Sequence, residues 1–174
     1  VKEIEGIIDL LAENNFTHIE LAFGNEGLRF LLDDMSLRVG GNDYSSAEVT
    51  AAIQTGNKTL TTASSGELSE SNMDTIIQYA NEKGIGVIPL FNAPGHMYTV
   101  VSAMDTLRVG AKSVNVETGS GGKTTNMAID PTDPAAVNFV QALMQKYVNY
   151  FTRKNCTMFN IGADESGISG STYS

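Results

Sequence analysis

Residues 76–97 read IIQYANEKGIGVIPLFNAPGHM, and this stretch decides the class of fold. Its first part continues the apolar spacing of one helix face, made by Met73, Ile76, Ile77 and Ala80. Gly84 after Lys83 is typical of the left-handed position at which a helix ends. The apolar run Gly86–Phe91 has the length of a buried strand, and residues 92–95 interrupt it. A helix followed directly by a buried strand predicts one unit of a parallel α/β fold.

The same order of helix and strand occurs nearer the N-terminus. An apolar helical stripe is formed there by Ile4, Ile7, Ile8 and Leu11. The segment Thr17–Phe23 follows and has the alternation of a strand. One of its faces carries Ile19, Leu21 and Phe23, and the other carries His18, Glu20 and Ala22. A second helix–strand unit is therefore predicted.

Polar residues mark where the other helices begin. Ser71 and Asp74 have the spacing of a capping box at the start of the helix before Gly84. Asp133 and Pro134 are typical of the cap and first position of a third helix. Its predicted buried stripe is Val137, Val140, Met144, Tyr147, Val148 and Phe151. The short apolar segment Thr157–Ile161 then predicts another buried strand.

The number of units bears on the architecture. Residues 33–67 and 110–130 are predicted to be loops with little regular structure. Three or four parallel strands remain, whereas a closed (β/α)8 barrel has eight strands in about 250 residues. A small open sheet and part of a barrel both fit this number. The polar inward set of His18, Glu20 and Asn160 favours the half barrel, a fragment of the TIM-barrel type.

Composition excludes several classes of protein. The chain has 20 acidic and 11 basic residues and a net charge of −9, which disfavours a nucleic-acid partner. No apolar run reaches the roughly 20 residues of a membrane-spanning helix, so membrane insertion is not expected. Cys156 is the only cysteine, which excludes an internal disulfide and a cysteine-based zinc site. An acidic surface of this kind suits a neutral polar substrate such as a glycan.

The sharpest chemical signal is the segment Asn160–Glu165 at the end of the last predicted strand. Active sites of parallel barrels are built at the carboxyl ends of the strands, where Asp164 and Glu165 fall. Two adjacent carboxylates repel, so a partly dry site raises the pKa of one of them. A general acid that works near neutral pH needs such a raised pKa. The alternative is an acidic first turn of the next helix, stabilised by the helix dipole.

A second signal, Pro94-Gly95-His96, closes the strand Gly86–Phe91. It is therefore expected on the same rim as the Asp-Glu pair. A histidine at that place can hydrogen-bond a catalytic carboxylate and set its proton affinity. The alternative is a turn in which His96 caps or packs.

Together these segments resemble family 20 glycoside hydrolases over nearly the whole chain and in the family's order. The passage 76–97 resembles their helix, strand and "PGH" motif, and FNIGADE at 159–165 resembles their strand motif ending in Asp-Glu. IEGIIDLLAENNFTHIELAFGNEGLRF at 4–30 resembles their first helix and second strand. IDPTDPAAVNFVQALM at 129–144 also fits.

The resemblance implies a β-N-acetylhexosaminidase or lacto-N-biosidase-like enzyme that acts on glycans with terminal N-acetylhexosamine. In such enzymes the substrate's own acetamido group replaces an enzyme nucleophile. Carried over, Glu165 is the general acid and base, Asp164 orients the acetamido group, and His96 positions the acid. No metal or organic cofactor is implied. A secreted or cell-surface location in bacteria is expected from the family alone.

The chain also departs from the family pattern. Asn160 stands where the family commonly has His, and Asn92 stands where it commonly has Asp. Residues 1–174 are expected to be a partial catalytic barrel that lacks the first strand, with its sugar-binding Arg, and the second half. An alternative therefore stays open, a catalytically incomplete fragment that only folds, self-associates or binds glycan weakly. Open strand edges in such a fragment favour a homo-oligomer.

Two further residues are candidates for substrate binding or support, beside His96 and Asn160. Arg29 follows the strand Thr17–Phe23 and can aim at the site, although pairing with Asp33 or Asp34 is the alternative. Tyr98 follows the His96 turn and is predicted to line the pocket. Glu20 is interpreted as a structural polar residue of the barrel interior.

Overall fold

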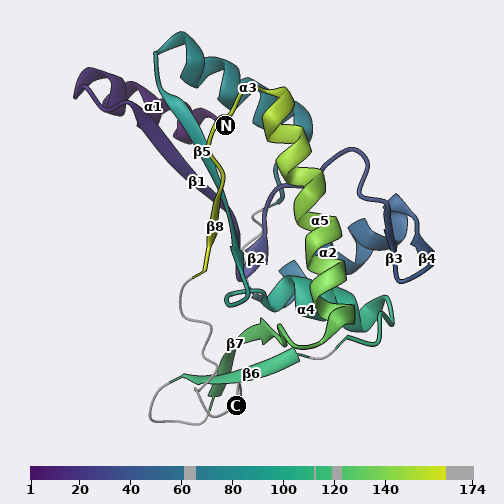
Figure 1. Ribbon diagram of the computed structural model, residues 1–174. Coiled ribbons are helices and arrows are strands. Elements are labelled where there is room, and N and C mark those ends of the chain that lie inside the picture. Colours follow the sequence, from purple (N-terminus) through teal and green to yellow (C-terminus); the bar gives the residue numbers. More distant parts are fainter. Residues whose placement is uncertain (61–65, 112, 119–122, 164–174) are drawn as a thin grey trace.

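The chain, seen here in a computed structural model, is built around a small sheet. The structure describes residues 1–60, 66–111, 113–118 and 123–163 (Figure 1). Within these ranges three strands run parallel, β1 (His18–Asn25), β5 (Gly86–Ala93) and β8 (Asn160–Gly162). The short strand β2 (Gly27–Leu28) turns back antiparallel to β1, and the sheet order is β2-β1-β5-β8. The three predicted parallel strands are confirmed.

Strand register brings the ends of the parallel strands to one edge. Glu20 lies opposite Ile88, and Leu90 lies opposite Asn160 on the other side of β5. Near the carboxyl ends, Ala93 lies opposite Gly162. Because the strands are parallel, their carboxyl ends all lie at the same end of the sheet.

Three helices supply most of the predicted framework, α1 (Lys2–Glu13), α3 (Glu70–Glu82) and α5 (Pro134–Arg153). Their place in the chain agrees with the sequence pattern, and α5 runs along one side of the sheet (Figure 1). The face of α5 that is buried is turned relative to the prediction. It consists of Ala136, Phe139, Val140, Leu143, Tyr147, Tyr150 and Phe151. Val137, Met144 and Val148 are only partly buried.

An aromatic cluster joins α5 to the sheet. The ring centroid of Phe23 lies 4.8 Å from Tyr147, 5.5 Å from Phe151 and 5.7 Å from Phe91. The predicted alternation of β1 is confirmed, because Phe23 is buried towards the helices while Glu20 on the opposite face is exposed. The opposite face of the sheet is the one that a closed barrel would enclose.

The two predicted loops are in fact largely regular, so that prediction was wrong. The first contains the hairpin β3 (Leu37–Val39) and β4 (Asn42–Tyr44), followed by α2 (Ser46–Leu60). The second contains the antiparallel pair β6 (Ser113–Thr118) and β7 (Lys123–Ile129). A further helix, α4 (Tyr98–Thr106), follows the His96 turn and was not predicted.

The physical reason is that these elements carry weak sequence signals. The buried stripe of α2 includes Gly56 and Asn57, which interrupt the apolar spacing that marks a helix. The strands of the β3–β4 hairpin have three residues each, too few to show alternation. Their turn is formed by Gly40 and Gly41 at φ of 59° and 83°, a conformation that glycine adopts readily.

The predicted cap of α3 was wrong, because the observed cap lies two residues earlier in the chain. The helix is capped by Ser69, whose hydroxyl accepts a hydrogen bond from Asn72 N, while the Asn72 side chain accepts one from Ser69 N. Asn72 makes the reciprocal bond that Glu or Gln usually makes at the third helical position. Because the usual Glu or Gln is absent, the sequence pattern did not indicate this capping box. The predicted end was right, because Gly84 has a φ of 73°.

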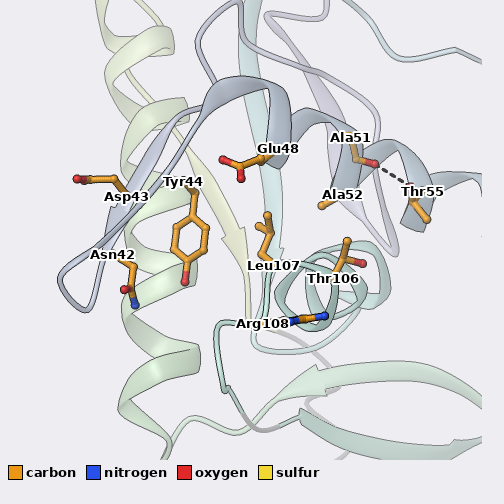
Figure 2. Close-up of a pocket in the computed structure, with 10 residues that line it drawn as sticks. All are labelled: Asn42, Asp43, Tyr44, Glu48, Ala51, Ala52, Thr55, Thr106, Leu107 and Arg108. Atoms are coloured by element: carbon orange, nitrogen blue, oxygen red, sulfur yellow. Dashed lines mark hydrogen bonds between the residues drawn. The ribbon is translucent and has the colours of Figure 1, made fainter.

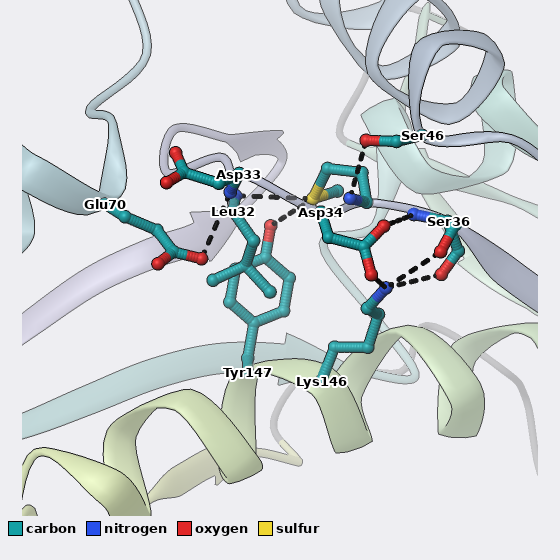
Figure 3. A network of polar contacts seen from close by, with 9 residues as sticks. Leu32, Asp33, Asp34, Ser36, Ser46, Glu70, Lys146 and Tyr147 are labelled. Carbon is teal, nitrogen blue, oxygen red and sulfur yellow. Dashed lines mark hydrogen bonds and ion pairs between the residues drawn. The ribbon is translucent and has the colours of Figure 1, made fainter.

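A polar network fastens the segment after β2 onto α5 (Figure 3). Lys146 Nζ lies 3.0 Å from an Asp34 carboxylate oxygen and donates to Ser36 O at 2.6 Å. The buried Tyr147 hydroxyl donates to Phe30 O at 2.7 Å. These contacts hold the chain between β2 and β3 against the helix. Within the described ranges, no helix combines the length and apolar character that a membrane span needs.

Candidate functional site

Polar side chains gather where β1 and β5 end, beside the last residues of β8. This strand-end cluster comprises the polar side chains of Asn25, Glu26, Asn92 and His96, together with Gly162, whose backbone approaches Asn92. Each member follows or ends a parallel strand, so the topology alone brings the five together (Figure 1). The carboxyl edge of parallel strands is the place where barrel enzymes build their sites.

His96 and Glu26 form the centre of this cluster. Their side chains meet at 2.9 Å between Nδ1 and a carboxylate oxygen, and they are only 15% and 26% exposed. The backbones also meet, because Glu26 N donates to His96 O at 2.6 Å. A carboxylate at Nδ1 fixes the orientation of the ring and favours a proton on that nitrogen. His96 is therefore held in one orientation by a carboxylate, as a histidine that acts on another acid requires.

Backbone strain accompanies this pair. Glu26 and His96 have φ of 60° and 53°, in the left-handed region that non-glycine residues rarely adopt. Each such residue costs on the order of 1 kcal/mol or more and persists where the surroundings hold it. Glu26 O accepts from Thr99 N at 2.9 Å, which ties the turn to the first residues of α4.

The buried amide of Asn92 links β5 to both neighbouring strands. Its Nδ2 donates to Asn25 Oδ1 at 3.2 Å, and the side chain is 4% exposed. A Cβ atom at Gly162 would overlap the Asn92 side chain, and Gly162 has a φ of 68°. Both the close approach and the left-handed backbone therefore require glycine at position 162.

Asn160 lies two residues before Gly162, on the face of the sheet opposite the helices. Its Nδ2 donates to a Glu20 carboxylate oxygen at 2.8 Å, and its Oδ1 accepts from Gly162 N at 2.8 Å. The predicted inward position of Glu20 and Asn160 is thus accompanied by a direct contact between them.

Two of the predicted site residues, Asp164 and Glu165, lie outside the described residues. The described chain ends at Ala163, which has a φ of 61° and donates from its N to Ile161 O at 2.8 Å. Gly162, one member of the strand-end cluster, is therefore two residues before Asp164 in the chain.

Arg29 has a different environment from the one expected. Its guanidinium donates to Asn57 O at 3.5 Å, and the side chain lines a hollow of about 380 Å³ at the outer edge of β1. The expected alternative of an ion pair with Asp33 or Asp34 is not seen among the described residues, where Lys146 pairs with Asp34.

Tyr98 is the first residue of α4 and is partly buried. Its hydroxyl has no hydrogen-bond partner within the part of the chain that the structure describes. It stands two residues after His96, and its place in the lining of the pocket stays a prediction.

A hollow of about 600 Å³ lies elsewhere, between β4, α2 and the end of α4 (Figure 2). None of its lining residues belongs to the strand-end cluster. Its two carboxylates are engaged locally, because Glu48 accepts from Ser45 and Asp43 lies 3.6 Å from Arg38. In the described part of the chain, no group of three or more His, Cys, Asp or Glu side chains is arranged to hold a metal ion.

Sequence reasoning missed Glu26 and Asn57. The buried Asn57 amide accepts from Leu28 N and Thr99 Oγ1 and donates to Leu28 O, so it joins α2, β2 and α4. A signal for Glu26 existed in Asn25-Glu26-Gly27, a turn-type tripeptide at the end of a strand. Asn57 gave no such signal, because Leu28 and Thr99, the two partners on β2 and α4, are 29 and 42 residues distant in the chain.

Comparison with known proteins gives consistent matches. The family model described as "Glycosyl hydrolase family 20, catalytic domain" matches residues 1–172. Lacto-N-biosidase of Bifidobacterium bifidum is 30% identical over 148 residues, which are 84% of this chain and 12% of that protein.

Among solved structures, a catalytic module of the pneumococcal exo-β-D-N-acetylglucosaminidase StrH is 35% identical, with a TM-score of 0.86. That match covers 95% of this chain and 39% of the StrH chain. The exo-β-N-acetylglucosaminidase of Vibrio harveyi, 17% identical with a TM-score of 0.64, shows likeness of fold alone over 94% of this chain and 25% of that one. The chain thus spans well under half of each of these proteins. The predicted fold class, part of a (β/α)8 barrel, is confirmed.

Proposed function

The chain belongs to glycosyl hydrolase family 20, and from this premise we propose that it carries the acid/base machinery of a β-N-acetylhexosaminidase. The proposed reaction releases terminal β-linked N-acetylhexosamine from glycans. The observation that supports it most is the His96–Glu26 pair, held at the strand edge where the chain leads into Asp164 and Glu165. A secreted or cell-surface location in a bacterium is part of the same proposal, supported by the bacterial relatives.

In the proposed mechanism the substrate supplies its own nucleophile. The carbonyl oxygen of the 2-acetamido group attacks the anomeric carbon while Glu165 protonates the departing glycosidic oxygen. Water then attacks the anomeric carbon while Glu165 removes a proton from that water, and the bond from this carbon to the acetamido oxygen breaks. Two displacements at the same carbon retain its configuration. Family 18 and 20 enzymes are recognised exceptions to the scheme with two carboxylates and an enzyme nucleophile.

Asp164 has the proposed task of holding the acetamido N–H and stabilising the positive charge that develops on the ring. A fixed anion beside a developing cation is most effective where water is excluded. His96 is proposed to position Glu165, and Glu26 supports that role by holding the histidine ring through Nδ1. Tyr98 and Arg29 are proposed to contribute to the pocket that binds the sugar.

We also propose that residues 1–174 form one partial catalytic barrel domain that lacks the first strand and the second half. In the sheet order, the outer edges of β1 and β8 have no further parallel strand among the described residues. The hollow beside β1 is lined largely by apolar side chains such as Leu21, Phe23 and Met73, which suits an additional strand.

Hydrolysis of a chromogenic β-N-acetylglucosaminide by the folded 174-residue chain tests the proposal. Glu165→Gln should lower turnover by about 100-fold or more, as loss of general acid–base catalysis does. Glu13→Gln, at the exposed end of α1, is the matched control and should leave turnover unchanged. A β-glucoside, which has a hydroxyl in place of the acetamido group, should not be cleaved. Full activity of Glu165→Gln would overturn the assignment of the acid.

A second candidate is the incomplete fragment that self-associates and binds glycan only weakly. Large apolar side chains on the surface favour it, namely Ile7, Leu10, Phe16, Met158 and Ile161, which are 42% to 60% exposed. Lack of turnover by a demonstrably folded chain, with a molar mass above that of a monomer in light scattering, would support this candidate over the first.

A further inference from the structure

A chain of hydrogen bonds crosses the face of the sheet opposite the helices and ends at the turn before Asp164. Glu20 accepts from the Asn160 amide nitrogen, and the Asn160 amide oxygen accepts from Gly162 N, each at 2.8 Å. The amide of Asn160 is thus used at both ends. One end reaches β1, and the other reaches the backbone of its own strand.

The first of these bonds spans the central strand. Glu20 lies opposite Ile88 and Asn160 lies opposite Leu90, so the bond passes over β5 to join the two strands that flank it. β8 has only three residues, and its pairing with β5 is irregular between Leu90 and Ala93. The side-chain contact therefore adds a link from β8 to β1 that the backbone pairing with β5 does not provide.

The second bond fixes the direction in which the chain leaves the sheet. Gly162 and Ala163 are consecutive left-handed residues, at φ of 68° and 61°. Alanine in this conformation costs roughly 1–2 kcal/mol, so the turn persists only where other contacts hold it. The bond from Gly162 N to the Asn160 side chain is such a contact.

The carboxylate of Glu20 determines which end of the Asn160 amide points towards β1. An ionised carboxylate only accepts hydrogen bonds, so it draws the NH2 end of the amide towards β1. The oxygen of Asn160 is then left towards Gly162 N. A neutral partner that both donates and accepts would allow either orientation of the amide.

We propose that Glu20 and Asn160 are positioning residues for the Asp164–Glu165 pair. Asn160 holds the Gly162–Ala163 turn, and Glu20 sets the orientation of the Asn160 amide. The inference rests on the proposed function and deepens it, because it gives Asn160 a supporting task in place of contact with the sugar. It also gives Glu20 a task in the site.

A reciprocal exchange of the two polar groups tests the inference. Asn160→Asp alone places two carboxylates at the bond and should lower kcat by about 10- to 100-fold, with a smaller change in KM. The double variant Glu20→Gln/Asn160→Asp reverses the polarity of the bond. The new amide on β1 can donate to the new carboxylate on β8, whose second oxygen still accepts from Gly162 N. The double variant should regain at least about tenfold of the lost kcat.

The amide hydrogen exchange of Gly162 gives a readout that does not need turnover. Asn160→Asp should speed its exchange by about tenfold or more, and the double variant should restore protection. Asn138→Asp, the same change of charge on the exposed side of α5, is the control and should alter neither quantity. Urea midpoints of all variants separate a local effect from loss of the fold.

The two proposals fail in different ways. If the wild-type chain shows no turnover, the proposed activity of the isolated chain is wrong. The exchange of the Gly162 amide still tests whether Glu20 and Asn160 hold the turn. The inference is overturned if Gly162 exchange in Asn160→Asp equals that of wild type. It is equally overturned if the double variant is no better than Asn160→Asp in both readouts.

Discussion

At the scale of single residues, the side chain of Tyr147 links separate parts of the core. It is fully buried, and burial raises the pKa of its hydroxyl. The hydroxyl donates to Phe30 O, while the ring packs on Phe23 and Phe91. It therefore connects α5 to the sheet and to the segment after β2.

Tyr147→Phe should lower the free energy of unfolding by about 1–2 kcal/mol, because Phe30 O is left buried without this donor. Urea unfolding followed by circular dichroism measures the difference. Tyr44→Phe is the matched control. Tyr44 is partly buried and its hydroxyl has no hydrogen-bond partner among the described residues, so its removal should cost less than about 0.5 kcal/mol. Equal losses in the two variants would contradict the assigned role of the Tyr147 hydroxyl.

Asp34 gives a prediction about pH. Hydrogen bonds from Ser36, and then from Lys146, lower the pKa of Asp34 from 3.8 to about 2. A carboxyl whose pKa is lower in the folded state stabilises the fold above its unfolded pKa and loses that effect as the pH falls. Asp34→Asn should therefore be less stable than wild type at pH 6, and the difference should close between about pH 4 and pH 2.

The size of this difference is limited by solvent. The Asp34 side chain is 70% exposed, so screening keeps the effect below about 1 kcal/mol. Urea midpoints at a series of pH values give the measurement. Asp43→Asn is the control, because Asp43 and Arg38 are both exposed and 3.6 Å apart, and its effect at pH 6 should be smaller. A difference for Asp34→Asn that grows on acidification would show that the sign is wrong.

How far single site residues could be predicted depends on whether the signal was local. His96 was singled out from its tripeptide at the end of a strand, and the structure holds it there in a partly buried pair. Glu26 was not singled out, since its partner is 70 residues distant and only strand pairing brings them together. The Glu20–Asn160 bond spans 140 residues, so the sequence predicts a common face but not a contact.

At the scale of elements, the N-cap of α3 allows a matched comparison. Ser69→Ala should lower the free energy of unfolding by about 1 kcal/mol, because it removes the acceptor of Asn72 N. Ser71→Ala, at the position that the sequence pattern favoured, lies in the exposed first turn and should change it by less than about 0.5 kcal/mol. Thermal or urea unfolding of both variants decides between the two caps. The reverse order of losses would restore the sequence-based assignment.

The elements that could be predicted are those with a continuous apolar pattern. β1 and β5 were identified because each buries the apolar side chains of one face, and α5 because it buries seven side chains along its length. α4 lacked such a signal, since its sequence YTVVSAMDT is rich in β-branched residues and it has no side-chain cap. Tertiary contacts with α2 then stabilise a helix that local preference alone does not indicate.

At the scale of the whole molecule, the sheet has two outer edges within the described residues. The sequence pattern predicts parallel units but contains no information on which neighbours cover β1 and β8. The exposed Ile161 lies on the short strand β8, and the exposed Leu10 lies on α1. Edge strands with apolar side chains pair readily with other chains. The surface of the 174-residue chain is therefore expected to favour self-association.

Substitutions at these two places should separate the surfaces involved. Ile161→Lys introduces a charge on the edge strand and should raise the dissociation constant of self-association by about tenfold, since a buried unpaired charge opposes strand pairing. Leu10→Lys tests the α1 face in the same way. Sedimentation equilibrium over a range of concentrations measures both, with Thr55→Lys on the exposed side of α2 as the control. A wild-type chain that stays monomeric throughout, or three variants with equal behaviour, would contradict the expected association through the open edges. A strong effect of Ile161→Lys alone would assign the contact to the outer edge of β8, the strand that precedes Asp164 and Glu165.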